Sequence, residues 1–225
     1  MILISNIHQK IEFVNISNSA SANFTRAARR FADRAIELDN PEIHSRYPQT
    51  HPERIEREAA LLDTSLVAVL TSYFAIEAAV NELYAGFGSY GLDPALLAAL
   101  AAKWPDVERR NTIEKAKAAL GIAKASIDWG SGVAQDDLPL LDALRDALVH
   151  HKPHSMTTGD VDDLERKLRG RFKQAQIWEG TGVSFRWAGC LGGGCARWAA
   201  DTAVNFQRDF FGALGCKSYP SESVK

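Results

Sequence analysis

Residues 136–153 read DDLPLLDALRDALVHHKP, a stretch that ends on a pair of histidines, a lysine and a proline. It has the pattern of an amphipathic helix, because its leucines recur at three- and four-residue spacing and share one face: Leu141, Leu144 and Leu148. Pro153 disfavours helical geometry for the residue before it, which predicts that the helix ends at His150 or His151. Arg145 lies in the predicted helix, five residues before His150. This helix therefore carries two groups suited to phosphate chemistry near one end.

The composition is that of an ordinary globular protein. Of the 225 residues, 46% are apolar and 24% are charged, which is enough apolar material for one domain with a core. The formal net charge of -2 argues against a general nucleic-acid coat, so any contact with RNA or DNA would need a local basic patch.

Cysteine usage and hydropathy predict a cytoplasmic protein without membrane association. The three cysteines fit a reducing compartment. A zinc site is not expected, because neither a histidine nor a second cysteine pair lies near Cys190 and Cys195 in the sequence. The first ten residues lack the basic start and apolar run of a signal peptide. Residues 64–85 are apolar but interrupted by polar side chains, which favours a buried helix over a membrane span.

Helical periodicity recurs along most of the chain and predicts an all-α bundle. Further helices are expected at residues 19–38, 53–84, 94–103, 106–125, 161–172 and 195–214. Three prolines predict an irregular loop at 39–52, and alternating apolar residues around EGTG predict a small β-hairpin at 176–188. The predicted organisation is an N-terminal arm or short strand at 1–17, a helical domain at 18–214 with the hairpin inserted, and a C-terminal tail at 215–225.

Arg145 and His150 are the leading candidates for catalysis. Their spacing alone means little, because Arg46 and His51 repeat it in the predicted loop. Context distinguishes the first pair, since the polar Asp146 follows the arginine directly and the histidine falls at a helix end. The apolar helix SYFAIEAAVNELY (72–84) precedes the pair, and ARWAADTAVNFQRDFFGAL (196–214) follows it.

With these features the chain resembles the HEPN superfamily of helical bundles. RDALVH (145–150) matches the family motif of an arginine and a histidine separated by four to six residues, and the resemblance extends loosely over residues 55 to 214. It does not cover the first 50 residues or the hairpin. The resemblance implies an endoribonuclease of toxin or defence type that cuts single-stranded RNA without a metal or cofactor. It also implies a homodimer that brings two motifs into one cleft, and an antitoxin or nucleotidyltransferase-like protein as a candidate partner.

The resemblance assigns roles to the motif residues. His150 would act as general acid or base, and Arg145 would hold the scissile phosphate. Asp146 lies four residues before His150 on the same helical face and can orient its imidazole, while His151 is the competing histidine. On an ideal helix Arg145 and His150 point about 140° apart, so either the helix unwinds near its end or a second subunit completes the site.

A non-catalytic interpretation stands beside the catalytic one. Arg145 can pair with Asp142 three residues earlier, leaving the histidines solvated, and the chain would then be an interaction or ligand-binding module. Glu77 and Asn81 share one face of the apolar helix, where a carboxylate needs a partner. Either Glu77 positions Arg145, or it is capped or water-bound at a helix interface.

Two further segments could bind anions. The densest basic cluster follows the motif, and it is either a contact for the RNA backbone or a solvated helix face: Arg166, Lys167, Arg169, Arg171 and Lys173. The glycine-rich GCLGGGC (189–195) could seat an anion on its backbone N–H groups. It lacks the Lys-Ser/Thr of a phosphate loop, so a role in turn geometry is favoured.

Overall fold

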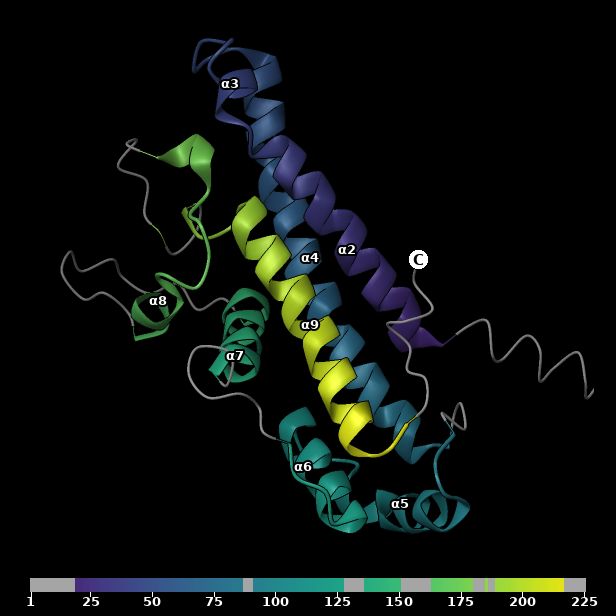
Figure 1. Cartoon of the computed structure of the whole chain (residues 1–225). Coiled ribbons are helices and arrows are strands. Elements are labelled where there is room, and N and C mark those ends of the chain that lie inside the picture. The colour runs from purple at the N-terminus through teal and green to yellow at the C-terminus, as the bar shows by residue number, and fades with distance from the viewer. Residues whose placement is uncertain are drawn as a thin grey trace, which may run out of the picture. The chain divides into compact units, whose positions relative to one another are not determined.

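The computed structural model describes residues 19–86, 91–127, 136–150, 163–179, 185 and 189–216. Within these ranges every regular element is a helix and no strand is formed, which confirms the all-α prediction (Figure 1). The predicted arm at 1–17 lies outside the described residues, as does the tail beyond residue 216.

The chain clusters into two compact units. Unit 1 comprises residues 1–25, 74–128 and 205–225, and unit 2 comprises residues 26–73 and 129–204. Three helices contribute residues to both units: α2 (Ala20–Leu38), α4 (Pro52–Tyr84) and α9 (Gly193–Ala213). The single helical domain predicted at 18–214 stays a prediction.

Helix α4 begins and ends within one residue of the predicted range 53–84. Its C-terminal half is apolar nearly all round, and most of its side chains are almost fully buried: Ala68, Val69, Tyr73, Ala75, Ile76, Ala79, Val80, Leu83 and Tyr84. By length and composition α4 could also cross a membrane, a criterion that buried core helices meet equally.

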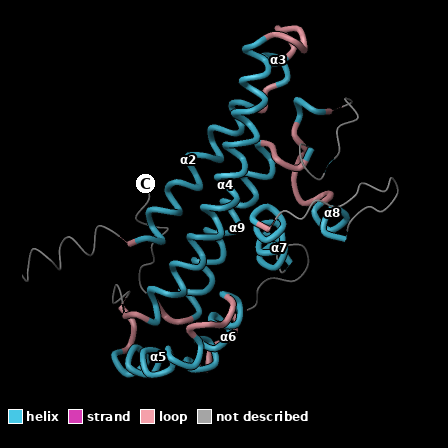
Figure 2. The backbone as a smooth tube through the Cα atoms, turned by 180° about the vertical axis from the view of Figure 1, so that it is seen from behind, coloured by secondary structure: helices cyan, strands magenta, loops and turns pink. Residues whose placement is uncertain are grey.

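Unit 2 is built on small side chains. Its core cluster lies between α2, α4, α9 and a 3-10 turn, η2 (Gln176–Trp178), and is mostly alanine: Ala28, Ala32, Ala35, Leu38, Leu61, Ala68, Ile177, Ala196 and Ala200. Figure 2 shows α2, α4 and α9 side by side. Alanines permit close approach of the helix backbones, which explains why the buried stripe of α2 contains so few large residues. The unit also contains α3 (Pro41–His44), α7 (Asp137–Val149) and α8 (Asp163–Leu168).

Unit 1 contains α5 (Pro94–Val107) and α6 (Thr112–Ala123), with parts of α2, α4 and α9. Polar contacts join these segments. The Tyr84 hydroxyl donates to the Lys115 carbonyl at 2.8 Å, and Gln207 Nε2 donates to Thr25 Oγ1 at 3.0 Å. The Ser19 hydroxyl donates to the Glu82 carboxylate at 2.9 Å, beside the start of α2.

Four predicted boundaries are wrong. Pro105 predicts a break, but α5 continues through it for most of a turn, and the next helix begins only after Asn111, which caps Glu114 N–H at 2.9 Å. The predicted loop at 39–52 contains α3, because Asn40 caps its first turn and Pro41 suits its first position. The predicted helix at 161–172 is only α8 in the described residues.

The fourth correction concerns the hairpin. Residues 176–178 form η2 rather than the first predicted strand, and residues 180–184 and 186–188 lie outside the described ranges. The alternation in the sequence arises here because Ile177 points into the core of unit 2, while Gln176 is exposed.

Candidate functional site

Helix α7 positions the Arg/His motif. Its inner face is buried through four leucines: Leu138, Leu140, Leu141 and Leu144. The helix ends at Val149, and the backbone N–H of His150 closes the last turn by donating to the Asp146 carbonyl at 2.9 Å. The predicted end is therefore confirmed. His150 is exposed, and His151 lies outside the described residues.

Arg145 is held on three sides. Its Nη2 donates to Asp142 Oδ1 at 2.7 Å, and its Nη1 forms an ion pair with Asp146. The guanidinium carbon lies 4.1 Å from the centroid of the Tyr73 ring, a cation–π contact with the core helix α4. The Nε atom is buried and has no hydrogen-bond partner in the part of the chain that the structure describes. The Arg145–Asp142 pair of the non-catalytic interpretation is thus present.

These neighbours set the charge of Arg145. Burial acts to lower its pKa, but the Tyr73 side chain and the carboxylates of Asp146 and Asp142 outweigh burial and raise that pKa. The side chain is 22% exposed. The result is a permanently charged guanidinium with a fixed orientation, which can bind an anion only along its accessible edge.

The supporting residues have other partners. The Asp146 carboxylate contacts Arg145, so its predicted role in orienting His150 stays a prediction. Asn81 accepts a hydrogen bond from Lys115 Nζ at 3.0 Å, in unit 1. Glu77 is only half-buried, and it belongs to unit 1 whereas Arg145 belongs to unit 2, so their predicted contact is also not established.

The basic cluster is largely engaged in ion pairs. Arg166 and Lys167 both contact Asp163, the latter at 2.6 Å, and Arg169 pairs with Glu165. Arg171 bridges to the start of α7, 3.2 Å from Asp136 and 3.3 Å from Asp137. Lys173 is exposed. These pairs support the interpretation as a solvated face, and contact with RNA stays a prediction.

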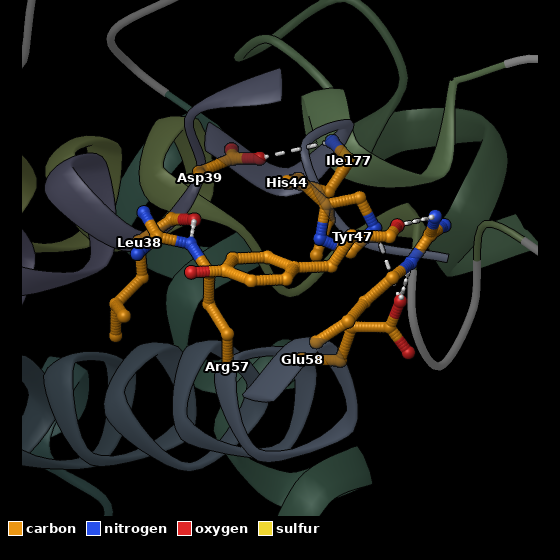
Figure 3. Close-up of polar contacts among 8 residues, drawn as sticks. Leu38, Asp39, His44, Tyr47, Arg57, Glu58 and Ile177 are labelled. Carbon is orange, nitrogen blue, oxygen red and sulfur yellow. Dashed lines mark hydrogen bonds and ion pairs between the residues drawn. The ribbon is translucent and has the colours of Figure 1, made fainter. Parts of the chain in front are cut away.

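One backbone N–H of the glycine-rich segment, that of Gly193, binds a carboxylate of the same chain, Asp39, which also accepts two N–H groups of η2. Asp39 Oδ1 accepts the backbone N–H of Gln176 at 2.7 Å. The same oxygen accepts the backbone N–H of Ile177 at 3.2 Å (Figure 3). Asp39 Oδ2 accepts the N–H of Gly193 at 3.0 Å, at the N-terminus of α9. Burial raises the pKa of Asp39, which is 3% exposed, although the three N–H groups oppose that rise.

Close backbone approach explains the three glycines. A Cβ at Gly192 would lie 2.9 Å from Asp39 Oδ2, and one at Gly193 would lie 2.8 Å from Ile36 Cα. A Cβ at Gly194 would lie 2.3 Å from the Lys173 carbonyl oxygen. Close approach of neighbouring segments therefore explains these glycines, and binding of an external anion by this segment stays a prediction.

A second polar cluster lies where α3 meets α4. His44 is 4% exposed, and its Nε2 lies 3.0 Å from Glu58 Oε1 (Figure 3). That oxygen accepts a hydrogen bond from Arg54 Nε at 3.0 Å. Burial lowers the pKa of His44, and the positive charge of Arg54 adds to this against the opposing charge of Glu58. Burial therefore favours a neutral imidazole, and neither of its nitrogens makes a hydrogen bond of good geometry among the described residues.

Arg57 completes this junction. It donates from Nε to the Leu38 carbonyl at 3.1 Å and from Nη2 to the Glu37 carbonyl at 2.5 Å, so it satisfies the last carbonyls of α2. Sequence reasoning missed Asp39, His44 and Arg57. Only the position of Asp39 directly after a predicted helix could have suggested an interaction, and nothing local indicated its partners.

The cysteines do not form a reactive centre. Cys190 and Cys195 are buried with their sulfurs 3.9 Å apart, and the neighbouring Cys190 thiol together with burial raises the pKa of Cys195. A thiol of this kind is a poor nucleophile. No group of three or more His, Cys, Asp or Glu side chains suited to a metal ion occurs among the described residues.

No protein-family model, no curated protein sequence and no solved structure matches this chain. The HEPN resemblance therefore rests on the residues quoted for it.

Proposed function

We propose that this chain is a HEPN-like, metal-independent endoribonuclease that cuts single-stranded RNA through Arg145 and His150. The observation that carries the proposal is the arrangement at the end of α7. An exposed His150 follows Arg145, whose guanidinium contacts the Tyr73 ring and donates a hydrogen bond to Asp142. A fixed, always charged arginine is suited to a phosphate, and an exposed imidazole is suited to proton transfer.

In the proposed reaction, the 2′-hydroxyl of the ribose attacks the adjacent phosphorus and the 5′-oxygen of the next nucleotide leaves. His150 moves a proton at one of these two oxygens, and Arg145 offsets charge on the phosphate oxygens in the transition state. The products are a 2′,3′-cyclic phosphate end and a free 5′-hydroxyl. No step requires a metal.

The proposal includes a homodimer. Because Arg145 and His150 are five residues apart on a helix, their side chains point about 140° apart. The two side chains of one protomer are therefore poorly placed to contact the same phosphate. A two-fold interface lets Arg145 of one protomer face His150 of its partner.

The test is cleavage of single-stranded RNA by purified protein in EDTA. We expect Arg145→Ala and His150→Ala each to reduce the rate by about 10²- to 10⁴-fold. Arg197→Ala is the matched control, because Arg197 is an exposed arginine paired with Asp33 in the same unit, and its loss should leave the rate unchanged. Cleavage that survives both motif changes would contradict the proposal.

Mixing the two inactive variants tests the dimer. If each site takes its arginine from one protomer and its histidine from the other, a mixed dimer of Arg145→Ala and His150→Ala regains one complete site. After subunit exchange, about a quarter of wild-type activity should return. No recovery, together with a mixed dimer shown by mass, would contradict the shared site.

The second candidate is a non-catalytic module that binds a protein or a small ligand. The Arg145–Asp142 and Arg145–Asp146 ion pairs favour it, because together they neutralise the arginine. It predicts no RNA cleavage under any of these conditions, and no effect of the motif variants on RNA.

A further inference from the structure

The contacts of Arg145 differ in how easily they can be replaced. The Tyr73 ring covers one face of the guanidinium and is itself buried, and Asp142 is 24% exposed. Asp146 is 55% exposed on the other paired nitrogen, Nη1. Asp146 is therefore the most exposed of the three groups that contact the guanidinium.

We infer that Asp146 occupies the place of a substrate phosphate on Arg145 and is displaced when an RNA phosphate binds, whereas Asp142 and Tyr73 hold the guanidinium in position. The inference rests on the RNA binding at Arg145 that belongs to the proposed function, but not on cleavage. Asp146 is thus an internal competitor of the substrate.

Charge and exposure favour such an exchange. Asp146 is 55% exposed, so water screens its contact with Arg145 and loss of that contact costs little. A phosphate offers two oxygens to the planar fork of an arginine and replaces one anion by another, so the guanidinium is never left without a counter-charge. Asp142 and Tyr73 stay in place and prevent the side chain from moving outward with its ligand.

The displaced carboxylate has a second partner within reach. Asp146 lies four residues before His150, a spacing that puts both side chains on one face of α7. Phosphate binding on Arg145 would release Asp146 to contact the imidazole of His150. The orienting role predicted from the sequence would then belong to the RNA-bound protein.

The experiment measures the affinity of the protein for a short fluorescein-labelled single-stranded RNA by fluorescence anisotropy. His150→Ala is the background, so that the RNA stays intact. We expect Asp146→Asn to bind the RNA about three- to tenfold more tightly, because the competitor is removed while the arginine remains. Adding Arg145→Ala to Asp146→Asn should abolish the gain.

Asp33→Asn is the matched control for charge. It removes one exposed carboxylate that is paired with an arginine, Arg197, in the same unit, but leaves the surroundings of Arg145 intact. A gain that is confined to Asp146→Asn and requires Arg145 supports the inference. An equal gain in Asp33→Asn, or a gain that persists without Arg145, shows general electrostatics and overturns it.

The inference and the proposed function fail separately. Tighter binding in Asp146→Asn without any cleavage by the wild-type protein supports the displaced carboxylate and contradicts the ribonuclease. Cleavage by the wild-type protein without a change of affinity in Asp146→Asn supports the ribonuclease and contradicts the displaced carboxylate. Absence of RNA binding in both proteins overturns the inference as well as the function.

Discussion

Two places in unit 2 pair a group that can bind anions with a carboxylate of the same chain. At the N-terminus of α9 the group is the backbone N–H of Gly193, and in the C-terminal half of α7 it is the guanidinium of Arg145. At α9 the carboxylate of Asp39 accepts three backbone N–H groups and is 3% exposed. At α7 the carboxylate of Asp146 pairs with Arg145 and is 55% exposed. The sequence suggested anion binding at both segments, and the two carboxylates differ in how deeply they are buried.

A ligand can compete with the carboxylate only where the carboxylate is exposed and its loss costs little. Removing Asp39, which is 3% exposed, would leave three backbone N–H groups without their acceptor, which is costly. Removing Asp146 leaves a guanidinium edge that water or a phosphate can satisfy. The first carboxylate is therefore part of the fold, and the second is available for exchange.

The largest expected effect is that of Asp39→Ala. Loss of the acceptor for Gln176, Ile177 and Gly193 should lower the free energy of unfolding by about 3 kcal/mol or more, measured by urea denaturation. Asp33→Ala, which removes an exposed carboxylate, should change it by less than about 0.5 kcal/mol. A loss below about 1 kcal/mol in Asp39→Ala would remove the contrast between the two helix ends.

Chain separation explains why the Asp39 contacts could not be predicted. Asp39 lies 137 residues before Gln176 and 154 residues before Gly193, and no local pattern links them. The long helices were predictable from the sequence. Apolar residues recur at helical spacing along the 19 residues of α2, and the 33 residues of α4 contain no glycine and no proline after the first residue. Short elements such as α3 depend on one cap and on tertiary contacts, which periodicity does not detect.

The candidate site was predictable only where its contacts are local in the sequence. The Arg145–Asp142 pair follows from a three-residue spacing on one helix, and it is present. The Tyr73 contact joins α7 to α4 and depends on how the two helices pack, so no spacing along the chain indicates it. Local signals can also mislead: Pro105 predicted a break in the helix, but α5 continues through it.

A second prediction tests the close approach at α9. Gly194→Ala should lower the free energy of unfolding by about 2 kcal/mol, because its Cβ would meet the Lys173 carbonyl oxygen at 2.3 Å. Gly212→Ala is the control in the same helix, with no atom within 4 Å of its added Cβ, and should raise stability by about 0.5 kcal/mol. Equal effects of the two changes in urea denaturation would contradict the close approach.

A third prediction concerns pH and the junction beside Asp39. Burial lowers the pKa of His44 below its ordinary value of 6.5, so the unfolded chain takes up the proton first as the pH falls. Above that ordinary value both states are neutral at this residue. Stability should therefore fall as the pH drops from 6.5 through the lower folded-state pKa.

Variants isolate this contribution. His44→Gln should show a shallower loss of stability than the wild-type protein between about pH 7 and pH 5, measured by urea denaturation at several pH values. His150→Gln, which changes an exposed histidine, should keep the wild-type slope. An unchanged slope in His44→Gln would show that the buried imidazole is not the titrating group.

The smallest expected effect is that of Asp146→Asn on stability, and it decides the comparison of the two carboxylates. Because Asp146 is 55% exposed and water can replace much of its contact with Arg145, the change should alter the free energy of unfolding by less than about 0.5 kcal/mol in urea denaturation. Asp142→Asn should cost more, about 1 kcal/mol, since Asp142 and Arg145 are both mostly buried. A cost in Asp146→Asn close to that of Asp39→Ala would make Asp146 a structural carboxylate. It could then not yield its place to a phosphate, and the exchange at Arg145 would be excluded together with the contrast between α7 and α9.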